Sequence, residues 1–305
     1  MRVVLTEHTR LGYVADSLAG LSVGDALGAQ YFMVGRRVAD LMAGVVPPPV
    51  WEWTDDTEMA CSVAWALTVS GRVDRDELAR AFADRCEPNR GYGVGAFTTL
   101  RRIRQGEPWS TVAAEAFGGQ GSCGNGAAMR VAPLGAYHLD SPATAAREAA
   151  AQAEVTHAHP EGIAGAVAVA VAASLATAAR VAGSRPAAGG FLGRVLVDVP
   201  AGSVRRGLTR ARAMLRASTA EAAYDLGNGS RVTAQDTVPF TVWVAARHLD
   251  DYPAAVRACV SAGGDADTTA AIVGGIVAGH TGRAGIPADW LAAREPLPAW
   301  MGVTA

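Results

Sequence analysis

Three glycines, Gly20, Gly24 and Gly28, recur at intervals of four within residues 10–30. Residues four apart lie on one face of an α-helix, so these glycines would form a narrow stripe without side chains. Such a stripe lets a second helix approach closely. The composition agrees, because half of the residues are hydrophobic but only 6% are aromatic, so the apolar content is mostly Ala, Val and Leu. We therefore expect closely packed helices.

Helix-start signals occur along much of the chain, whereas strand signals are scarce. Polar capping residues or proline open the helices that we expect after Asp74, at Ser141-Pro142, at Thr237-Val-Pro239 and at Asp251-Tyr-Pro253. Gly- and Pro-rich loops are expected at 44–49 and 183–190. The best strand candidate is 2–6, and alternating β–α units are absent, which argues against a parallel sheet. The sequence predicts an all-α fold, a single compact multi-helix domain spanning residues 1–305.

One segment has the composition of a membrane span. Between Glu161 and Arg180 lie 18 uncharged residues, a borderline length for crossing a bilayer. They are mainly Ala and Val, and they have no Trp or Tyr belt. We therefore interpret this segment as a buried core helix, and we expect no membrane partner.

Charge and cysteine usage narrow the possible partners and compartment. The net charge is −2 and no run of Lys or Arg is present, which disfavours nucleic acid as a partner. The four cysteines form neither a C-x-x-C pair nor a disulfide framework, and the N-terminus has no signal-peptide pattern. We expect a cytoplasmic protein that acts as a monomer.

Two short motifs have helical surroundings that argue against their usual functions. Residues 119–124 match G-x-G-x-x-G, but the dinucleotide fingerprint requires a preceding strand and 110–117 has a helical pattern. Residues 20–24 match G-x-S-x-G, but a nucleophile elbow needs a strand-to-helix turn. Ser22 is therefore expected to be a packing residue.

Two acidic segments, 53–58 and 263–269, each place two Asp carboxylates and nearby hydroxyls at the start of an apolar helix. Helix capping alone explains one such residue per helix, but not a pair at both starts. Because the following helices are apolar, both starts should lie near the core. If they meet, four carboxylates share a poorly hydrated space, and cations would have to neutralise them.

Oxygen-only ligands favour a hard divalent ion such as Mg²⁺, which binds a few carboxylates and keeps some waters. Two such ions would roughly balance four Asp charges. The second segment is not an EF-hand, because its loop is too short and no Glu closes it.

Six short blocks follow one another along the chain: Gly24-Asp-Ala-Leu-Gly28, Trp53-Thr-Asp-Asp-Thr57, Arg90-Gly-Tyr-Gly93, Gly124-Asn-Gly-Ala-Ala-Met-Arg130, Thr156-His157 and Gly263-Gly-Asp-Ala-Asp-Thr268. In content and order they resemble the ADP-ribosylglycohydrolase family, including its dinitrogenase-reductase-activating type, and the resemblance runs from about residue 10 to 280. The resemblance implies a one-domain all-α fold with two Mg²⁺ or Mn²⁺ ions.

The resemblance also implies roles for particular residues. The implied metal ligands are Thr54, Asp55, Asp56, Asp265, Asp267 and Thr268. The implied binding residues for ADP-ribose are Gly121, Ser122, Cys123, Gly124, Asn125, Gly126 and His157, with backbone N–H groups of the glycine-rich run around the diphosphate. Taken alone, His157 would be interpreted as an ordinary buried histidine.

The activity implied is hydrolysis of the bond between ribose C1″ and a modified target, most often an arginine side chain, in a protein or a small molecule. Such a reaction passes through an oxocarbenium-like state and needs a poised water. The metals would hold the ribose diol and lower the pKa of a bound water. Asp56, or else Asp55, would relay the proton.

One position departs from the family pattern. Many members have G-D-A-L-G-x-P-x-E, and Phe32 stands where that Glu is expected, so no carboxylate is available there. Two other functions stay open. One is another two-metal hydrolase, such as a phosphatase, which the four Asp residues alone would permit. The other is a non-catalytic module that binds ADP-ribose.

Overall fold

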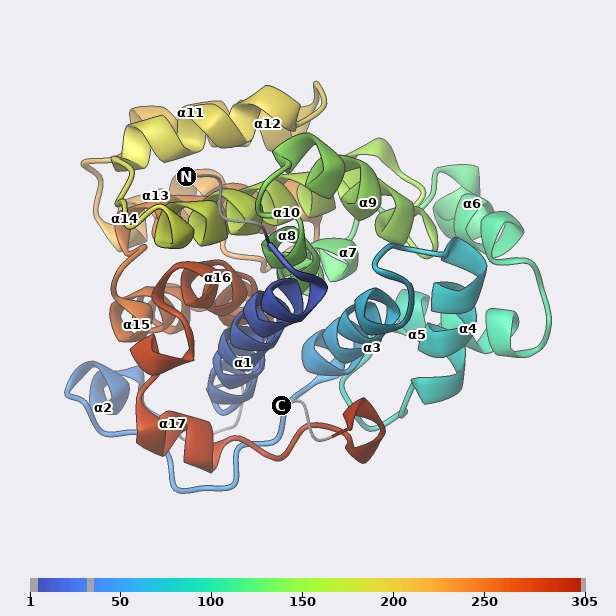
Figure 1. The fold of residues 1–305 in the computed structure, drawn as a ribbon, viewed down its shortest axis with the longest axis horizontal. Helices are drawn as coiled ribbons and strands as arrows, with labels where there is room; N and C mark the ends of the chain where they lie inside the picture. Colours follow the sequence, from blue (N-terminus) through green and yellow to red (C-terminus); the bar gives the residue numbers. More distant parts are fainter. Residues whose placement is uncertain (1–4, 32–35, 303–305) are drawn as a thin grey trace.

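The computed structural model describes residues 5–31 and 36–302, and in those residues the chain forms helices joined by turns (Figure 1). The only β-type pairings among them are two isolated bridges, Trp51 with Arg294 and Gly124 with Thr233. The predicted all-α fold is therefore confirmed. The strand candidate at 2–6 lies mostly outside the described residues. The helices are α1 (Glu7–Ala29), α2 (Val38–Met42), α3 (Asp55–Ser70), α4 (Arg75–Arg85), α5 (Val94–Arg104), α6 (Trp109–Gly119), α7 (Gly126–Met129), α8 (Ala132–Tyr137), α9 (Pro142–Glu154), α10 (Pro160–Val181), α11 (Ala188–Asp198), α12 (Ser203–Ala213), α13 (Thr219–Leu226), α14 (Ala234–Arg247), α15 (Tyr252–Ala262), α16 (Ala266–Thr281) and α17 (Ala288–Ala293), with 3-10 turns η1 (Arg283–Gly285) and η2 (Ala299–Met301).

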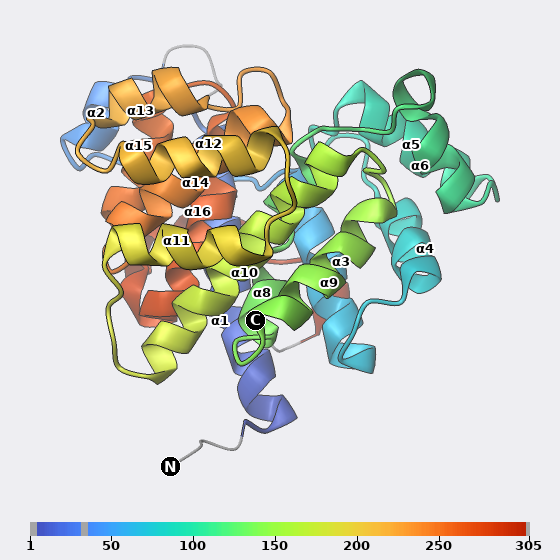
Figure 2. The same ribbon diagram turned by 90° about the horizontal axis from the view of Figure 1, so that it is seen from above.

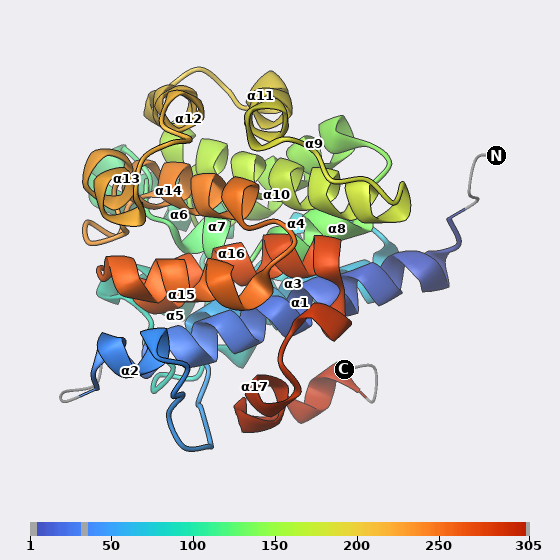
Figure 3. The same ribbon diagram turned by 90° about the vertical axis from the view of Figure 1, so that its left-hand side faces the viewer.

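The glycine stripe of α1 packs directly on α16, and this is the most extensive helix pair in the described fold (Figures 1 and 3). A Cβ added at Gly20, Gly24 or Gly28 would lie 2.2–2.5 Å from a backbone carbonyl oxygen of α16. No real Cβ fits at that distance. The close approach predicted from the spacing is therefore present, and it places the C-terminal half of α1 beside the start of α16.

The apolar segment before Arg180 forms α10, which is long and apolar enough to cross a membrane by length and composition alone. Within the fold, 89% of its apolar window is buried. It packs against α8, α9, α14 and α16. The predicted core helix is confirmed.

The remaining helices surround this centre. Helices α11 and α12 form an outer layer beyond α10 and α14, and α2 and α17 lie on the opposite side, below α1 (Figure 3). Helices α4, α5 and α6 group together at one end of the molecule (Figure 2).

Most of the helix starts lie where the sequence placed them. Side chains of Asp74, Ser141 and Asp251 cap α4, α9 and α15. The start expected at Thr237 was wrong, because α14 begins at Ala234 and Pro239 lies inside it. The proline ring there packs over α12, where a Cβ on Gly207 would lie 2.5 Å from Pro239 Cγ. The expected loop 183–190 is also shorter, since α11 begins at Ala188.

The two motif interpretations agree with the structure. Residues 110–117 lie in α6, so no strand precedes the G-x-G-x-x-G run. Ser22 is buried within α1, and its hydroxyl donates to the carbonyl oxygen of Ala19. It acts as a packing residue.

Candidate functional site

The two acidic segments meet, although about two hundred residues separate them in sequence. Thr54 caps the start of α3 and Asp265 stands at the start of α16. Thr268 Oγ1 lies 3.4 Å from Asp56 Oδ2, across the junction of the two helix starts. One carboxylate oxygen from each of Asp25, Asp56 and Asp267 lies within 4.8 Å of the others. The convergence expected from the sequence is present.

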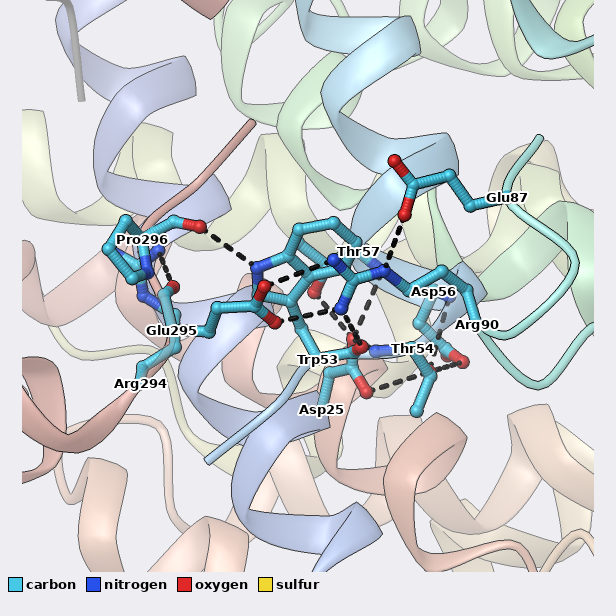
Figure 4. Close-up of polar contacts among 10 residues, drawn as sticks. All are labelled: Asp25, Trp53, Thr54, Asp56, Thr57, Glu87, Arg90, Arg294, Glu295 and Pro296. Carbon is cyan, nitrogen blue, oxygen red and sulfur yellow. Dashed lines mark hydrogen bonds and ion pairs between the residues drawn. The ribbon is translucent and has the colours of Figure 1, made fainter. Parts of the chain in front are cut away.

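Asp25, which the sequence analysis did not assign, is the fully buried third member of this cluster. Its Oδ2 accepts hydrogen bonds from Thr54 N (3.0 Å), Thr57 N (3.1 Å) and Thr57 Oγ1 (2.5 Å), and its Oδ1 accepts from Thr54 Oγ1 (2.8 Å). Figure 4 shows the side chain of Asp25 directed at the first turn of α3. A single charged residue between Gly24 and Gly28, on an otherwise apolar helix surface, was the signal that could have found it.

Asp56 has the most unusual environment of the cluster. It is 2% exposed, and its Oδ1 has no hydrogen-bond partner among the residues that the structure describes. Its Oδ2 lies near the hydroxyls of Thr54 (3.0 Å) and Thr268 (3.4 Å). A buried carboxylate oxygen without a donor is costly unless a cation or ligand satisfies it. The donor set, made of carboxylates and hydroxyls, suits Mg²⁺ or Mn²⁺.

The electrostatics of the cluster lead to the same conclusion. Burial, with the nearby Asp25 charge, raises the pKa of Asp55 from 3.8 to about 8. Burial and the neighbouring carboxylates also raise the pKa of Asp56 and of Asp267 well above the ordinary value. Without a cation, the protein therefore favours protonated acids here. A divalent cation would reverse this preference, so the residues fit a metal site.

Asp265 lies next to Asp267 and also contacts the glycine-rich loop. Its Oδ2 accepts a hydrogen bond of 2.7 Å from Asn125 Nδ2, which also lies 3.1 Å from Thr237 Oγ1. Asp267 Oδ1 accepts from the backbone N–H of Thr268 at 2.7 Å. Asn125 thus links the second acidic segment to the glycine-rich loop.

A cavity of about 730 Å³ opens above the cluster. Most of the residues assigned from the sequence line it, but Thr54 and Gly121 do not. Those in the lining are Asp55, Asp56, Asp265, Asp267, Thr268, Ser122, Cys123, Gly124, Asn125, Gly126 and His157. The volume suits a ligand of drug-like to dinucleotide size.

Two exposed apolar side chains on the cavity lining, both with an unusual backbone conformation, were missed from the sequence. Phe117 is 67% exposed and Val232 is 58% exposed, and both have a positive φ, of 52° and 55°. A non-glycine residue in this conformation is uncommon and is often functional. Their separation in sequence hid the fact that they border one cavity.

The glycine-rich loop, residues 121–126, is fixed by backbone packing and by backbone hydrogen bonds. A Cβ at Gly121 (φ 73°) would lie 2.6 Å from His159 N, so this glycine permits close backbone packing. The N–H groups of Gly121 and Asn125 already donate to Ala116 and Val232 carbonyls. The loop is therefore fixed before any ligand binds, but not all of its N–H groups are available to a diphosphate.

The C-terminal segment supports the first acidic segment through Arg90 (Figure 4). The backbone carbonyl oxygen of Arg90 accepts a hydrogen bond from the N–H of Asp55 at 2.8 Å. Its guanidinium lies 3.4 Å from the ring centroid of Trp53 and donates to both carboxylate oxygens of Glu295, at 2.8 and 3.0 Å. Trp53 Nε1 donates to Pro296 O. The departure at Phe32 lies outside the described residues.

Comparison with known proteins gives a consistent result. The family model described as ADP-ribosylglycohydrolase matches residues 6–303. The chain is 29% identical to "ADP-ribosylhydrolase ARH3" of Gallus gallus, covering 90% of this chain and 86% of the relative. It is 28% identical to "ADP-ribosyl-[dinitrogen reductase] glycohydrolase" of Rhodospirillum rubrum, covering 89% and 86%. A solved structure titled "ADP-ribosylglycohydrolase-related protein complex" aligns with a TM-score of 0.68 at 25% identity, covering 94% of this chain and 93% of that one.

Proposed function

Because the chain belongs to the ADP-ribosylglycohydrolase family, we propose that it hydrolyses the glycosidic bond between ADP-ribose and a modified target, with an ADP-ribosylated arginine side chain as the first choice. The expected enzyme class, a hydrolase acting on glycosyl bonds, agrees with the family model and with the names of the relatives. The observation that carries the proposal is the unpartnered, buried Oδ1 of Asp56 within a three-carboxylate cluster that opens into a cavity.

The proposed cofactor is a pair of Mg²⁺ or Mn²⁺ ions held by Thr54, Asp55, Asp56, Asp265, Asp267 and Thr268. When bound, the ions would supply positive charge for the ribose diol and for the acidification of a water. Asp25 would support them indirectly. It takes the hydroxyl proton of Thr54, which leaves a lone pair of that oxygen free for a ligand.

The cavity walls would position the rest of the substrate. The loop from Ser122 to Gly126 would border the diphosphate, and Phe117 offers an exposed aromatic face on which an adenine base can stack. Because Asp55 and Asp56 share the cavity floor, one of them would accept the proton of the attacking water. Asp56 is the first choice, since its Oδ1 has no hydrogen-bond partner in the described part of the chain.

The test uses Asp56→Ala and Asp267→Ala, with Asp250→Ala as a matched surface control. Asp250 forms only an exposed ion pair with Arg185. Both site variants should lose release of ADP-ribose while their circular dichroism matches wild type, and the control should keep its activity. The wild type should stop releasing ADP-ribose when a chelator is added. Turnover that survives chelation would contradict the metal-dependent proposal.

The substrate panel separates the remaining choices. It should contain arginine-, serine- and base-linked ADP-ribose and a small ADP-ribosylated metabolite, each assayed with Mg²⁺, with Mn²⁺ and with chelator. Preferential release from the arginine conjugate supports the proposed target. Phosphate release instead would indicate a phosphatase, and tight binding of ADP-ribose without turnover of any conjugate would indicate a binding module.

A further inference from the structure

Arg130 is fully buried at the lining of the cavity, and its hydrogen-bond partners among the described residues are all neutral. Nε donates to Gln152 Oε1 (2.8 Å), and Nη2 donates to Gln152 O (3.1 Å) and to Thr156 Oγ1 (3.0 Å). Nη1 lies 3.4 Å from Met59 Sδ. Burial lowers the pKa of Arg130 to about 9, which still leaves the guanidinium charged at neutral pH. The guanidinium lies 4.3 Å from the ring centroid of Phe82, and Asp55 is close enough to raise its pKa, but no carboxylate among the described residues is hydrogen-bonded to it. A buried cation without a hydrogen-bonded carboxylate is costly, so its position calls for an explanation.

The partners of Arg130 are fixed in orientation. Gln152 Nε2 donates to Ala127 O at 2.9 Å, so Gln152 Oε1 must face the guanidinium. A guanidinium has donors only. Thr156 Oγ1 therefore accepts from Arg130, and its own single proton is left for another acceptor. The other described side-chain atom within hydrogen-bond distance of Thr156 Oγ1 is His157 Nδ1, at 2.7 Å.

From this chain of hydrogen bonds we infer that Arg130 and Thr156 are positioning residues that hold His157 in the tautomer with its proton on Nε2. Since Nδ1 accepts the hydroxyl proton of Thr156, the proton of the neutral ring has to reside on the other nitrogen. A histidine that only packs in the core would not require a buried charged residue, such as Arg130, hydrogen-bonded to its partner Thr156.

The protonated nitrogen faces the site. A Cβ added at Gly124 or Gly126 would lie 3.2 or 3.1 Å from His157 Nε2, so the ring edge lies against the glycine-rich loop. His157 and both glycines line the cavity. The Nε2–H group is thus available as a fixed donor to an oxygen of the bound ligand, a phosphate or ribose oxygen of ADP-ribose. This last step rests on the proposed function, whereas the tautomer does not.

The charge state of His157 fits a donor rather than an acid. Burial, with a smaller effect from the Arg130 charge, lowers the pKa of His157 to about 3. The ring would stay neutral and would donate the same proton across the physiological range.

The first experiment is nitrogen-15 NMR of the full chain labelled at histidine, without ligand. The chain has six histidines, and the His157 signals are those lost in His157→Gln. The expected result is a protonated Nε2 and an unprotonated Nδ1, unchanged from about pH 5 to 8. A protonated Nδ1 in the wild type would overturn the inference, whatever the activity of the enzyme.

The second experiment tests the two positioning residues. Thr156→Val should release His157 into a mixture of tautomers and raise the dissociation constant of ADP-ribose about three- to tenfold, the loss of one hydrogen bond. Thr156→Ser should restore both. His159 serves as an internal control, because its Nδ1 accepts from Glu161 N and is independent of Thr156. An unchanged His157 tautomer in folded Thr156→Val would contradict the positioning role of Thr156. If that variant does not fold, Arg130→Met is measured in its place.

The two proposals fail separately. If the wild type releases no ADP-ribose but shows the expected His157 tautomer, the proposed function is wrong and the positioning role of Arg130 and Thr156 is supported. If ADP-ribose is released but His157 Nδ1 carries the proton, the positioning role is wrong and the proposed function is supported.

Discussion

Asp25→Asn tests whether the buried carboxylate of α1 organises the metal ligands or only packs the core. The change conserves shape and removes one charge. The amide oxygen can take the Oδ2 place, which receives three of the four hydrogen bonds. The amide nitrogen then faces Thr54 Oγ1, 2.8 Å away in the wild type, and turns that hydroxyl proton toward Asp56.

The expected magnitude follows from this rearrangement. Changing a residue that holds a metal ligand in place by hydrogen bonds typically costs about 10- to 100-fold in metal affinity, or about 1.4–2.7 kcal/mol. The metal-free protein should behave oppositely. Burial raises the pKa of Asp25 itself, and an ionised Asp25 raises the pKa of both Asp55 and Asp56, so the substitution removes a buried acid that repels its neighbours when it is charged. We expect the chelated variant to melt no lower than chelated wild type.

Calorimetric titration with Mn²⁺ and melting in chelator measure the two effects. The matched control is Asp16→Asn on the same helix, which loses only a partly exposed pair with Arg180 and should change stability by less than about 1 kcal/mol. Unchanged Mn²⁺ affinity together with a large loss of stability in Asp25→Asn would show that Asp25 does not organise the metal ligands and only packs the core.

Three further predictions follow from individual contacts. Gly24→Ala should destabilise the fold by about 1–3 kcal/mol because its Cβ would lie 2.2 Å from Ala270 O, whereas Gly12→Ala, with open space around it, should stabilise by up to about 1 kcal/mol; chemical denaturation compares them, and equal effects would contradict the close α1–α16 packing. The metal-free protein should lose stability as pH rises from about 4 to about 8, because the folded pKa of Asp55 is raised from 3.8 to about 8 and folding favours the protonated form. Melting temperatures in chelator should fall over this range and recover with Mg²⁺. A melting temperature that rises with pH would contradict this direction. Arg90→Gln should cost about 1–3 kcal/mol by removing the Trp53 stack and the paired bonds to Glu295, and it should weaken Mn²⁺ binding through Asp55; unchanged denaturation and titration curves would show that this contact supports nothing.

The parts of the fold that were predictable from the sequence are those set by local patterns. The glycine spacing in α1 is a helix-face pattern, and it gave the close contact with α16. The caps at Asp74, Ser141 and Asp251 act through hydrogen bonds within one turn, so they are readable without knowledge of the fold. Pro239 misled the prediction, because its place inside α14 depends on Gly207 of another helix.

The site divides in the same way. The two acidic segments stood out because paired carboxylates before apolar helices exceed what capping needs. Asp25 was missed because its function depends on hydrogen bonds to residues about thirty positions away. The link from Arg130 through Thr156 to His157 depends on the direction of each hydrogen bond, which requires three-dimensional contacts and cannot be read from spacing.

Electron paramagnetic resonance, which detects free Mn²⁺, can count the ions that bind to wild type and to Asp56→Ala. If the starts of α3 and α16 together hold a pair of divalent ions, two Mn²⁺ ions should bind per wild-type chain and that binding should be lost in the variant. A wild type that leaves all of the Mn²⁺ free, or a variant that binds it equally well, would contradict a metal site at these helix starts.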